Sequence, residues 1–86
     1  MVKVEVYTQA WCPYCMRAMQ LLRSKEVEVT EIKAGHGTPE RAEATRRSGG
    51  HTTVPQIFID GRAIGGCDDL VALDRAGGLD PLLQRA

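Results

Sequence analysis

Apolar and charged residues alternate at the start of the chain, and this period of two predicts a β-strand over residues 2–7. Val2, Val4 and Val6 fall on one face of the segment, and the charged residues between them fall on the other. We therefore expect the valine face of this strand to point into the core.

A helical pattern follows, and it begins at Pro13, because proline is favoured at the first position of a helix, where its missing N–H has no intrahelical role. The helix is expected to end near Lys25 or Glu26. Its buried stripe is predicted at four positions with the i, i+3, i+4, i+7 spacing, namely Cys15, Ala18, Met19 and Leu22.

Residues 27–32 are rich in β-branched side chains and complete a strand–helix–strand unit, whose strands should be parallel with a right-handed crossover. A helix is predicted next over 39–47, capped by Thr38. Two strands, over 53–59 and 62–64, should follow, joined by a hairpin turn at Asp60-Gly61. The last elements predicted are a helix that is capped by Asp68 or Asp69 and ends at Gly77-Gly78, and a short helix over 79–83. The order β-α-β-α-β-β-α predicts an α/β fold, a mixed four-stranded sheet flanked by helices, formed as one domain over residues 1–86.

Length and charge narrow the possible functions. A chain of 86 residues supports one small core. Its 11 basic and 11 acidic residues cancel, which argues against a nucleic-acid or anionic-lipid surface. No segment approaches the roughly 20 apolar residues needed to cross a bilayer, and the first residues lack the apolar run of a signal peptide. We therefore expect a cytoplasmic protein with no membrane or nucleic-acid partner.

The segment Trp11-Cys12-Pro13-Tyr14-Cys15 carries the clearest chemistry, because it places two cysteines at the start of the predicted helix. The free N–H groups at a helix start carry partial positive charge, which favours a thiolate on Cys12. Cys15 lies nearly one turn further on, close enough to form a disulfide with Cys12 but more buried. Cys12 is thus predicted to be a redox nucleophile, and Cys15 the thiol that resolves its mixed disulfide.

Two other uses of this cysteine pair stay open at this point. Cys12 and Cys15 could form half of a zinc site completed by Cys67 and either His36 or His51, although structural zinc usually takes two closely spaced ligand pairs. A purely structural disulfide is the second alternative, and the very short loop that it would close argues against it.

Three motifs follow one another along the chain: Cys12-Pro13-Tyr14-Cys15, then Thr53-Val54-Pro55-Gln56-Ile57-Phe58-Ile59, then Gly65-Gly66-Cys67-Asp68-Asp69-Leu70. In order and spacing they resemble the bacterial dithiol glutaredoxins of the thioredoxin superfamily, and the resemblance extends over nearly the whole chain. It implies a thioredoxin-like fold and a glutathione-dependent oxidoreductase that reduces protein disulfides and glutathione–protein mixed disulfides. It also implies a cis peptide bond between Val54 and Pro55.

The resemblance further implies where glutathione binds. The expected contacts are Tyr14 beside the glutathione sulfur, Thr53, Val54 and Pro55 along its backbone, and Gly66, Cys67, Asp68 and Asp69 around its γ-glutamyl group. The contacts around the γ-glutamyl group also have a general physical reason, because the free N–H groups at a helix start bind an anion without a basic side chain.

The chain departs from its family at two positions near the glycyl carboxylate of glutathione. Many glutaredoxins carry Lys and Arg where this chain has Gln9 and His51. Gln9 is uncharged and a histidine is mostly neutral above pH 7, so we expect weaker binding at this end of glutathione. Arg46 and Arg47 are the alternative sources of positive charge.

The resemblance also sets expectations about cofactors and partners. Glutathione is expected to act as a co-substrate, with no metal and no tightly bound cofactor, in a monomer that acts on glutathionylated or disulfide-containing proteins, ribonucleotide reductase among the candidates. The competing function is a module that holds an iron–sulfur cluster between two subunits through Cys12 and glutathione. Trp11 either lines a protein-substrate groove beside Cys12 or shields the helix start. The charged helix over 39–47 is expected to present a solvated face without a function.

Overall fold

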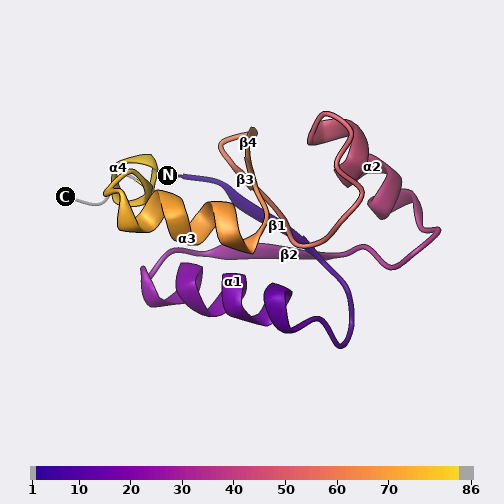
Figure 1. The fold of residues 1–86 in the computed structure, drawn as a ribbon, viewed down its shortest axis with the longest axis horizontal. Coiled ribbons are helices and arrows are strands. Elements are labelled where there is room, and N and C mark those ends of the chain that lie inside the picture. The colour runs from indigo at the N-terminus through magenta and orange to yellow at the C-terminus, as the bar shows by residue number, and fades with distance from the viewer. Residues whose placement is uncertain (1, 84–86) are drawn as a thin grey trace.

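The computed structural model describes residues 2–83 and shows a four-stranded sheet with helices against both faces (Figure 1). Its elements are β1 (Val4–Thr8), α1 (Pro13–Ser24), β2 (Val29–Lys33), α2 (Pro39–Arg47), β3 (Gln56–Ile59), β4 (Arg62–Gly65), α3 (Cys67–Arg75) and α4 (Leu79–Leu82). The strand order is β2-β1-β3-β4; β1 is parallel to β2 and antiparallel to β3, which pairs antiparallel with β4. The predicted fold class and element order are confirmed. Within residues 2–83, no helix is both long enough and apolar enough to cross a bilayer.

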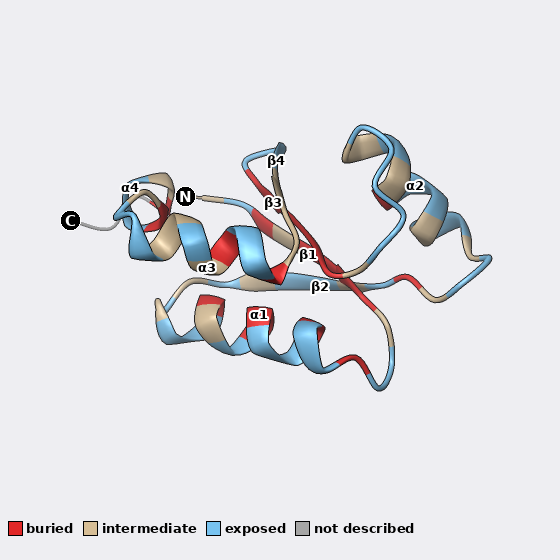
Figure 2. Cartoon of the chain, in the orientation of Figure 1, coloured by how far each residue is buried: buried red, intermediate tan, exposed pale blue. Residues whose placement is uncertain are grey.

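The larger core lies between one face of the sheet and helices α1 and α3. The antiparallel register sets Val4 opposite Ile59 and Val6 opposite Ile57, so these four side chains point to the same face. The buried residues of α1 are those that the sequence predicts: Cys15, Ala18, Met19 and Leu22. Figure 2 shows this stripe turned toward the sheet and the exposed side of α1 turned away. This packing contributes about 1.5–3 kcal/mol per large side chain and fixes the start of α1, where Cys12 lies.

A smaller core lies on the opposite face, under α2. The rings of Tyr7 and Phe58 meet edge to face with centroids 5.6 Å apart, and both side chains are buried. Ala44 of α2 and Ala34, just after β2, complete this cluster. α2 therefore covers the sheet face that α1 and α3 leave open. The Ala34 N–H, in the loop before α2, donates to the Thr8 carbonyl at the end of β1 at 2.7 Å.

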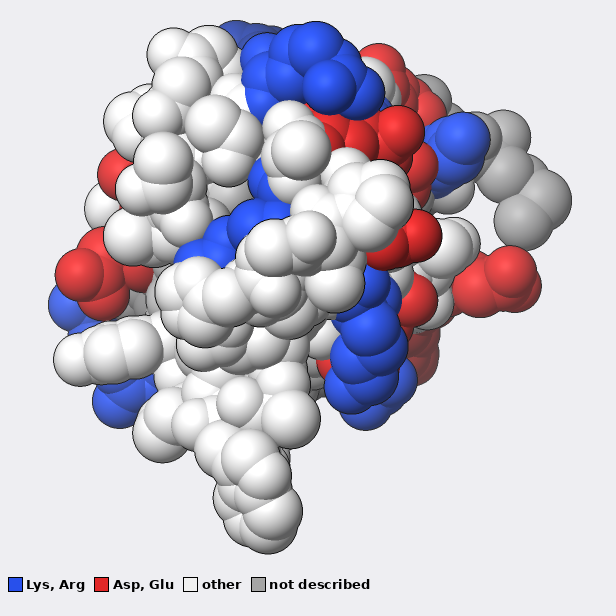
Figure 3. Space-filling model, turned by 90° about the vertical axis from the view of Figure 1, so that its right-hand side faces the viewer, with Lys and Arg blue, Asp and Glu red and all other residues white. Residues whose placement is uncertain are grey.

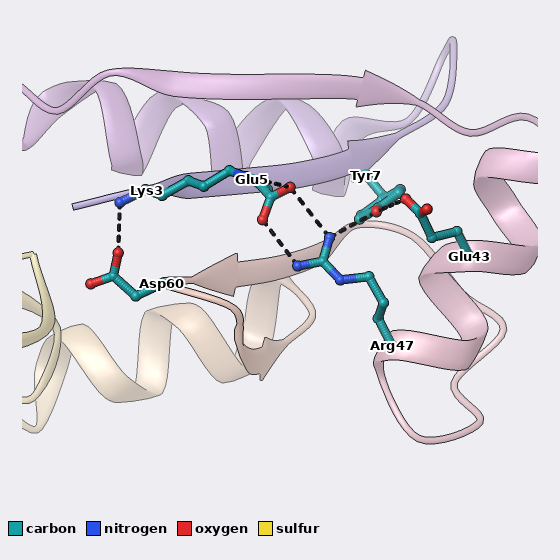
Figure 4. Close-up of polar contacts among 6 residues, drawn as sticks. All are labelled: Lys3, Glu5, Tyr7, Glu43, Arg47 and Asp60. Carbon is teal, nitrogen blue, oxygen red and sulfur yellow. Dashed lines mark hydrogen bonds and ion pairs between the residues drawn. The ribbon is translucent and has the colours of Figure 1, made fainter. Parts of the chain in front are cut away.

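Arg47, the last residue of α2, ties the helix to the sheet (Figure 4). Its two terminal nitrogens donate to the Glu5 carboxylate at 3.0 and 3.3 Å and to the Tyr7 hydroxyl at 2.8 Å, and its guanidinium carbon lies 4.1 Å from the Phe58 ring centroid. The Tyr7 hydroxyl donates in turn to Glu43. Hydrogen bonds from Arg47 hold the pKa of Glu5 below its usual value. The interpretation of residues 39–47 as a purely solvated charged face is therefore wrong for Arg47.

Several element boundaries differ from the prediction. The strand predicted over 53–59 begins only at Gln56, because Pro55 has no N–H to donate to a neighbouring strand. The strand predicted from residue 27 begins at Val29. The turn at Asp60-Gly61 is confirmed, since both residues have the positive φ, 50° and 80°, that a two-residue hairpin requires.

Candidate active site

Cys12 occupies the N-cap position of α1, where the helix begins at Pro13. Its Sγ accepts a hydrogen bond from the backbone N–H of Cys15 at 3.2 Å, and its carbonyl accepts one from Met16 at 3.1 Å. The sulfur thus lies at the positive end of the helix dipole and receives one of the N–H groups that the first turn cannot pair internally.

Cys15 faces the core from the first turn of the same helix and is only 3% exposed. Burial raises the pKa of its thiol to about 12, and its hydrogen bond with the neighbouring Cys12 side chain adds to the rise. Burial likewise raises the pKa of the Cys67 thiol. All three cysteines are free thiols. Cys12, 8% exposed, and Cys15 are therefore both buried, but Cys12 lies at the helix start and Cys15 faces the core.

A groove of about 240 Å³ runs between the start of α1, the loop before β3 and the start of α3. We call it the Pro55 groove; it is lined by Tyr14, His51, Thr53, Val54, Pro55, Gln56, Gly65, Gly66, Cys67, Asp68 and Asp69. The groove brings together all eight residues expected to contact glutathione, although they come from three separate parts of the sequence. The Val54–Pro55 peptide bond is cis, as the family resemblance implies.

Gln56 is a lining residue of this groove that sequence reasoning missed. Its side chain is buried, and its amide nitrogen donates to the Thr53 carbonyl at 2.9 Å, which braces the loop before β3. Its carboxamide oxygen is buried without a hydrogen-bond partner within residues 2–83. The motif position of Gln56, directly after Pro55, is the only signal that the sequence offered.

The start of α3 forms the other wall of the Pro55 groove. Gly66 is the N-cap and the helix begins at Cys67, so the predicted cap at Asp68 or Asp69 is wrong by two or three positions. Asp69 instead reaches back from the first turn, and its carboxylate accepts the Gly66 N–H at 3.0 Å. Gly65 has a φ of 116°, and a Cβ there would collide with the Asp69 carboxylate, so both backbone and space require glycine.

Two features of this wall stay available to a ligand. The N–H groups of the first turn of α3 have no partner within the helix. The exposed carboxylate of Asp68 makes no hydrogen bond or ion pair among the residues that the structure describes. The wall therefore offers anion-binding N–H groups next to a free carboxylate, which together match an amino acid's carboxylate and ammonium groups.

Gln9 and His51 line different grooves. His51 is exposed and lines the Pro55 groove, whereas Gln9 lines a second groove that also contains Cys12 and Cys15. Between them is Arg41 of α2, which sequence reasoning overlooked. Its guanidinium donates to the Gln9 side-chain oxygen at 2.9 Å and, through two nitrogens, to the Thr52 carbonyl at 3.0 and 3.1 Å. A guanidinium thus stands at this end of the site, and it belongs to Arg41 rather than to Arg46 or Arg47, the sources of positive charge that the sequence suggested.

A second groove, of about 330 Å³, opens on the β2 side of the cysteine motif. We call it the Trp11 groove; it is lined by Gln9, Ala10, Trp11, Cys12, Cys15, Met16, Met19, Gln20, Arg23, Glu31 and Lys33. Trp11 is 98% exposed, so it does not shield the helix start. Its φ of 58° lies in the left-handed region, which costs a non-glycine residue about 1–2 kcal/mol.

The cysteines and histidines proposed for a zinc site do not converge. Within residues 2–83, no three His, Cys, Asp or Glu side chains lie close enough together to hold a metal ion. Cys12 and Cys15 share the Trp11 groove, Cys67 and His51 line the Pro55 groove, and His36 is exposed in the loop before α2.

Comparison with known proteins identifies the family. The sequence model of glutaredoxin matches residues 4–64. Glutaredoxin 3 of Escherichia coli is 57% identical over 84 residues, which cover 98% of this chain and 100% of that protein. The solution structure of a Brucella melitensis glutaredoxin is 55% identical, with a TM-score of 0.81 over 96% of this chain and 89% of the other. A buckwheat glutaredoxin solved in complex with glutathione is 29% identical, with a TM-score of 0.83 over 96% of this chain and 77% of the other. The chain belongs to the glutaredoxin family of glutathione-dependent thiol–disulfide oxidoreductases.

Proposed function

We propose that Cys12 is the nucleophile of this oxidoreductase and that Cys15 is its resolving thiol. The hydrogen bond from the Cys15 N–H to the Cys12 Sγ at the start of α1 is the observation that carries this assignment. It favours negative charge on Cys12, whereas the raised pKa of the Cys15 thiol keeps that group protonated at neutral pH. Cys12 would therefore attack first, and Cys15 would react only in the later, resolving step.

In the monothiol route, the Cys12 thiolate attacks the glutathione sulfur of a glutathionylated protein. A Cys12–glutathione disulfide forms, and the protein sulfur leaves as a thiolate that takes up a proton. A second glutathione, as its thiolate, then attacks the bound glutathione sulfur. Glutathione disulfide leaves, and the Cys12 thiolate is restored.

In the dithiol route, the Cys12 thiolate attacks one sulfur of a protein disulfide and displaces the other as a thiolate. Cys15 then loses its proton and attacks the Cys12 sulfur, which releases the second protein thiolate and leaves a Cys12–Cys15 disulfide. Two glutathione molecules reduce that disulfide and become glutathione disulfide. Cys15 can stay protonated until this step. By then the Cys12 sulfur is part of a disulfide, so it is no longer the free neighbouring side chain that, besides burial, raises the pKa of Cys15.

We place glutathione in the Pro55 groove, with its sulfur toward Cys12. The solved buckwheat complex supports this choice of ligand. The γ-glutamyl carboxylate would accept hydrogen bonds from the N–H groups at the start of α3, and the γ-glutamyl ammonium group would pair with the Asp68 carboxylate. The backbone of Val54 would pair with the cysteinyl unit, and the half-exposed ring of Tyr14 would flank the sulfur.

The glycyl carboxylate would then lie toward Arg41 rather than toward a free Gln9 or His51. Arg41 holds the Thr52 carbonyl, and the residue after Thr52 lines the Pro55 groove. A guanidinium binds a carboxylate more strongly than glutamine or neutral histidine does. Arg47 does not supply this charge, because its guanidinium is paired with the Glu5 carboxylate. Arg41 donates only to uncharged oxygens, those of Gln9, Ala34 and Thr52, and makes no ion pair among residues 2–83.

The physiological setting follows from the same chemistry. We assign the reaction to the cytoplasm, where glutathione keeps thiols reduced. The protein would act as a monomer, with glutathione as its co-substrate and no tightly bound cofactor. Its protein substrates would be glutathionylated and disulfide-bonded proteins, with ribonucleotide reductase as one candidate by family resemblance.

A coupled assay tests the proposed function. The mixed disulfide of glutathione and 2-mercaptoethanol serves as substrate, and glutathione disulfide formation is followed by NADPH oxidation through glutathione reductase. We expect turnover that requires both the protein and reduced glutathione. A rate equal to uncatalysed exchange would contradict the proposal.

A further inference from the structure

We propose that the Trp11 groove binds the polypeptide that flanks the cysteine of a disulfide-bonded target protein, and that an apolar side chain and an acidic side chain of the target are recognised there. This inference rests on the proposed function and assigns its protein-substrate side. The Trp11 groove and the Pro55 groove share no lining residue, so they offer two separate surfaces on either side of the cysteine motif.

Cys12 and Cys15 both line the Trp11 groove, at 8% and 3% exposed, whereas neither lines the Pro55 groove. This distribution matters for the dithiol route. After Cys12 has displaced one target sulfur, the target is joined to Cys12 by a disulfide, and Cys15 must reach the Cys12 sulfur while the target is still attached. A target chain in the Trp11 groove stays beside both sulfurs until Cys15 forms its bond to Cys12 and the target thiolate departs.

Two large apolar side chains of this groove are exposed. Trp11 is 98% exposed and Met16 is 63% exposed, while Met19 forms the buried floor at 4%. The left-handed backbone of Trp11 holds its ring away from the domain, so the strain at this residue is not offset by burial of its side chain. In Figure 3, an uncharged lobe projects from the lower edge of the face that carries the β1–α1 loop. Exposed aromatic and methionine side chains beside a reactive group are typical of a surface that binds a partner.

The charges at the rim are not balanced. The Glu31 carboxylate already accepts hydrogen bonds from the Thr8 hydroxyl at 2.8 Å and from Lys33 at 3.0 Å, so the ion pair between Glu31 and Lys33 is neutral. Arg23, at the end of α1, adds an exposed positive charge to the same groove. The rim therefore favours an acidic side chain on the bound polypeptide.

The test uses two short synthetic peptides that each contain one internal disulfide and a leucine beside the first cysteine. They differ only in a distal residue, which is glutamate in one peptide and lysine in the other. Reduction by wild type, Trp11→Ala and Arg23→Glu is compared, with Arg62→Glu in β4 as a charge-matched control outside both grooves. Thermal melts verify that the variants are folded, because all three altered side chains are exposed.

We expect Trp11→Ala to raise the KM for both peptides by about tenfold, the size of a modest hot spot. Arg23→Glu should raise the KM for the glutamate peptide and lower it for the lysine peptide, while Arg62→Glu changes neither. Turnover of the mixed disulfide of glutathione and 2-mercaptoethanol should stay within about twofold for every variant, because that substrate does not need this groove. Equal losses on the small substrate and the peptides, or no loss on the peptides, would overturn the inference. An inactive wild type on the small substrate would instead refute the proposed function.

Discussion

The backbone N–H of Cys15 donates to the Sγ of Cys12 at 3.2 Å, while the Cys15 thiol itself is buried on the side of α1 that faces the core. The same turn of α1 therefore directs an N–H group at one sulfur, while burial raises the pKa of the other. This asymmetry is the physical basis of the division of labour proposed for the two cysteines.

Alkylation should report this asymmetry directly. Near neutral pH, limiting iodoacetamide should modify Cys12 and leave Cys15 and Cys67 unmodified, because burial raises the pKa of both of those thiols. Peptide mass spectrometry gives the site of modification. Cys15 should become reactive in the folded protein only at strongly alkaline pH, since its thiol pKa is about 12. Equal labelling of Cys12 and Cys15 at neutral pH would contradict the assignment.

The two aspartates at the start of α3 should respond differently to replacement. Asp69→Ala removes the acceptor of the Gly66 N–H and should lower the free energy of unfolding by about 1–2 kcal/mol, as loss of a helix cap does. Asp68→Ala loses only its charge near the helix start, worth about 0.3–1 kcal/mol. Its KM for a glutathione mixed disulfide should nevertheless rise more than that of Asp69→Ala. Urea denaturation and steady-state kinetics on both variants measure the contrast, and the reverse order of KM values would count against Asp68 as the ammonium contact.

Arg41 should contribute to glutathione binding through charge. Arg41→Gln is expected to raise the KM for the mixed disulfide by about two- to fivefold, with a smaller effect at high salt. The matched probe is glutathione whose glycyl carboxylate is converted to an amide. If Arg41 binds that carboxylate, wild type and Arg41→Gln should have similar KM values for the amide. A KM difference that persists with the amide would assign Arg41 a role in holding Thr52 and Gln9 instead.

The family resemblance suggests that Gln9→Lys, which restores the usual lysine, would strengthen binding of the glycyl carboxylate, but the contact between Gln9 and Arg41 changes that expectation. A lysine at this position would place a second positive charge beside the Arg41 guanidinium, in place of the oxygen that now accepts its hydrogen bond. Like charges at this distance repel, so the gain in affinity expected from the sequence should be largely cancelled. The KM of Gln9→Lys should fall by less than about twofold relative to wild type, and a larger fall would show that Gln9 itself faces the carboxylate.

The ion pair between Arg47 and Glu5 should make stability depend on pH. Arg47 lowers the pKa of Glu5 in the folded state, so the unfolded chain binds a proton at a higher pH than the native chain does. This contribution is present above about pH 4.3, the ordinary value for glutamate, and is lost as the pH falls below it. Arg47→Met should lower the free energy of unfolding by about 1–3 kcal/mol at pH 7 and by less at pH 3. Urea denaturation at the two pH values measures this difference, and an equal loss at both would show that stacking of Arg47 on Phe58 matters more than its charge.

Local patterns in the sequence predicted most of the fold. The period of α1, the proline at its start and the Asp60-Gly61 turn are each decided by neighbouring residues, and each is confirmed. The boundaries of α2 are also as predicted, because Thr38 caps the helix and Pro39 follows. Such features need no knowledge of the rest of the chain.

The features that the sequence did not reveal depend on contacts between distant residues. Arg41 and Arg47 belong to a run of charges that is typical of a solvated helix, and only the folded chain brings them to Thr52 and to Glu5. The cap of α3 was misplaced because an aspartate in the first turn can reach back as readily as one at the cap position. The family motifs predicted which residues would gather in the Pro55 groove. For Trp11 the sequence left two alternatives open, a groove beside Cys12 or a shield for the helix start, and only the structure gave the lining of the Trp11 groove.

Comparing single cysteine variants tests the central claim most directly. Cys12→Ser and Cys15→Ser are each assayed on the mixed disulfide of glutathione and 2-mercaptoethanol and on a peptide with an internal disulfide. We predict that Cys12→Ser loses both activities, whereas Cys15→Ser keeps turnover of the mixed disulfide, loses reduction of the peptide disulfide and accumulates a peptide joined to Cys12, visible by mass spectrometry. Measurable turnover of either substrate by Cys12→Ser would contradict the assignment of Cys12 as the nucleophile.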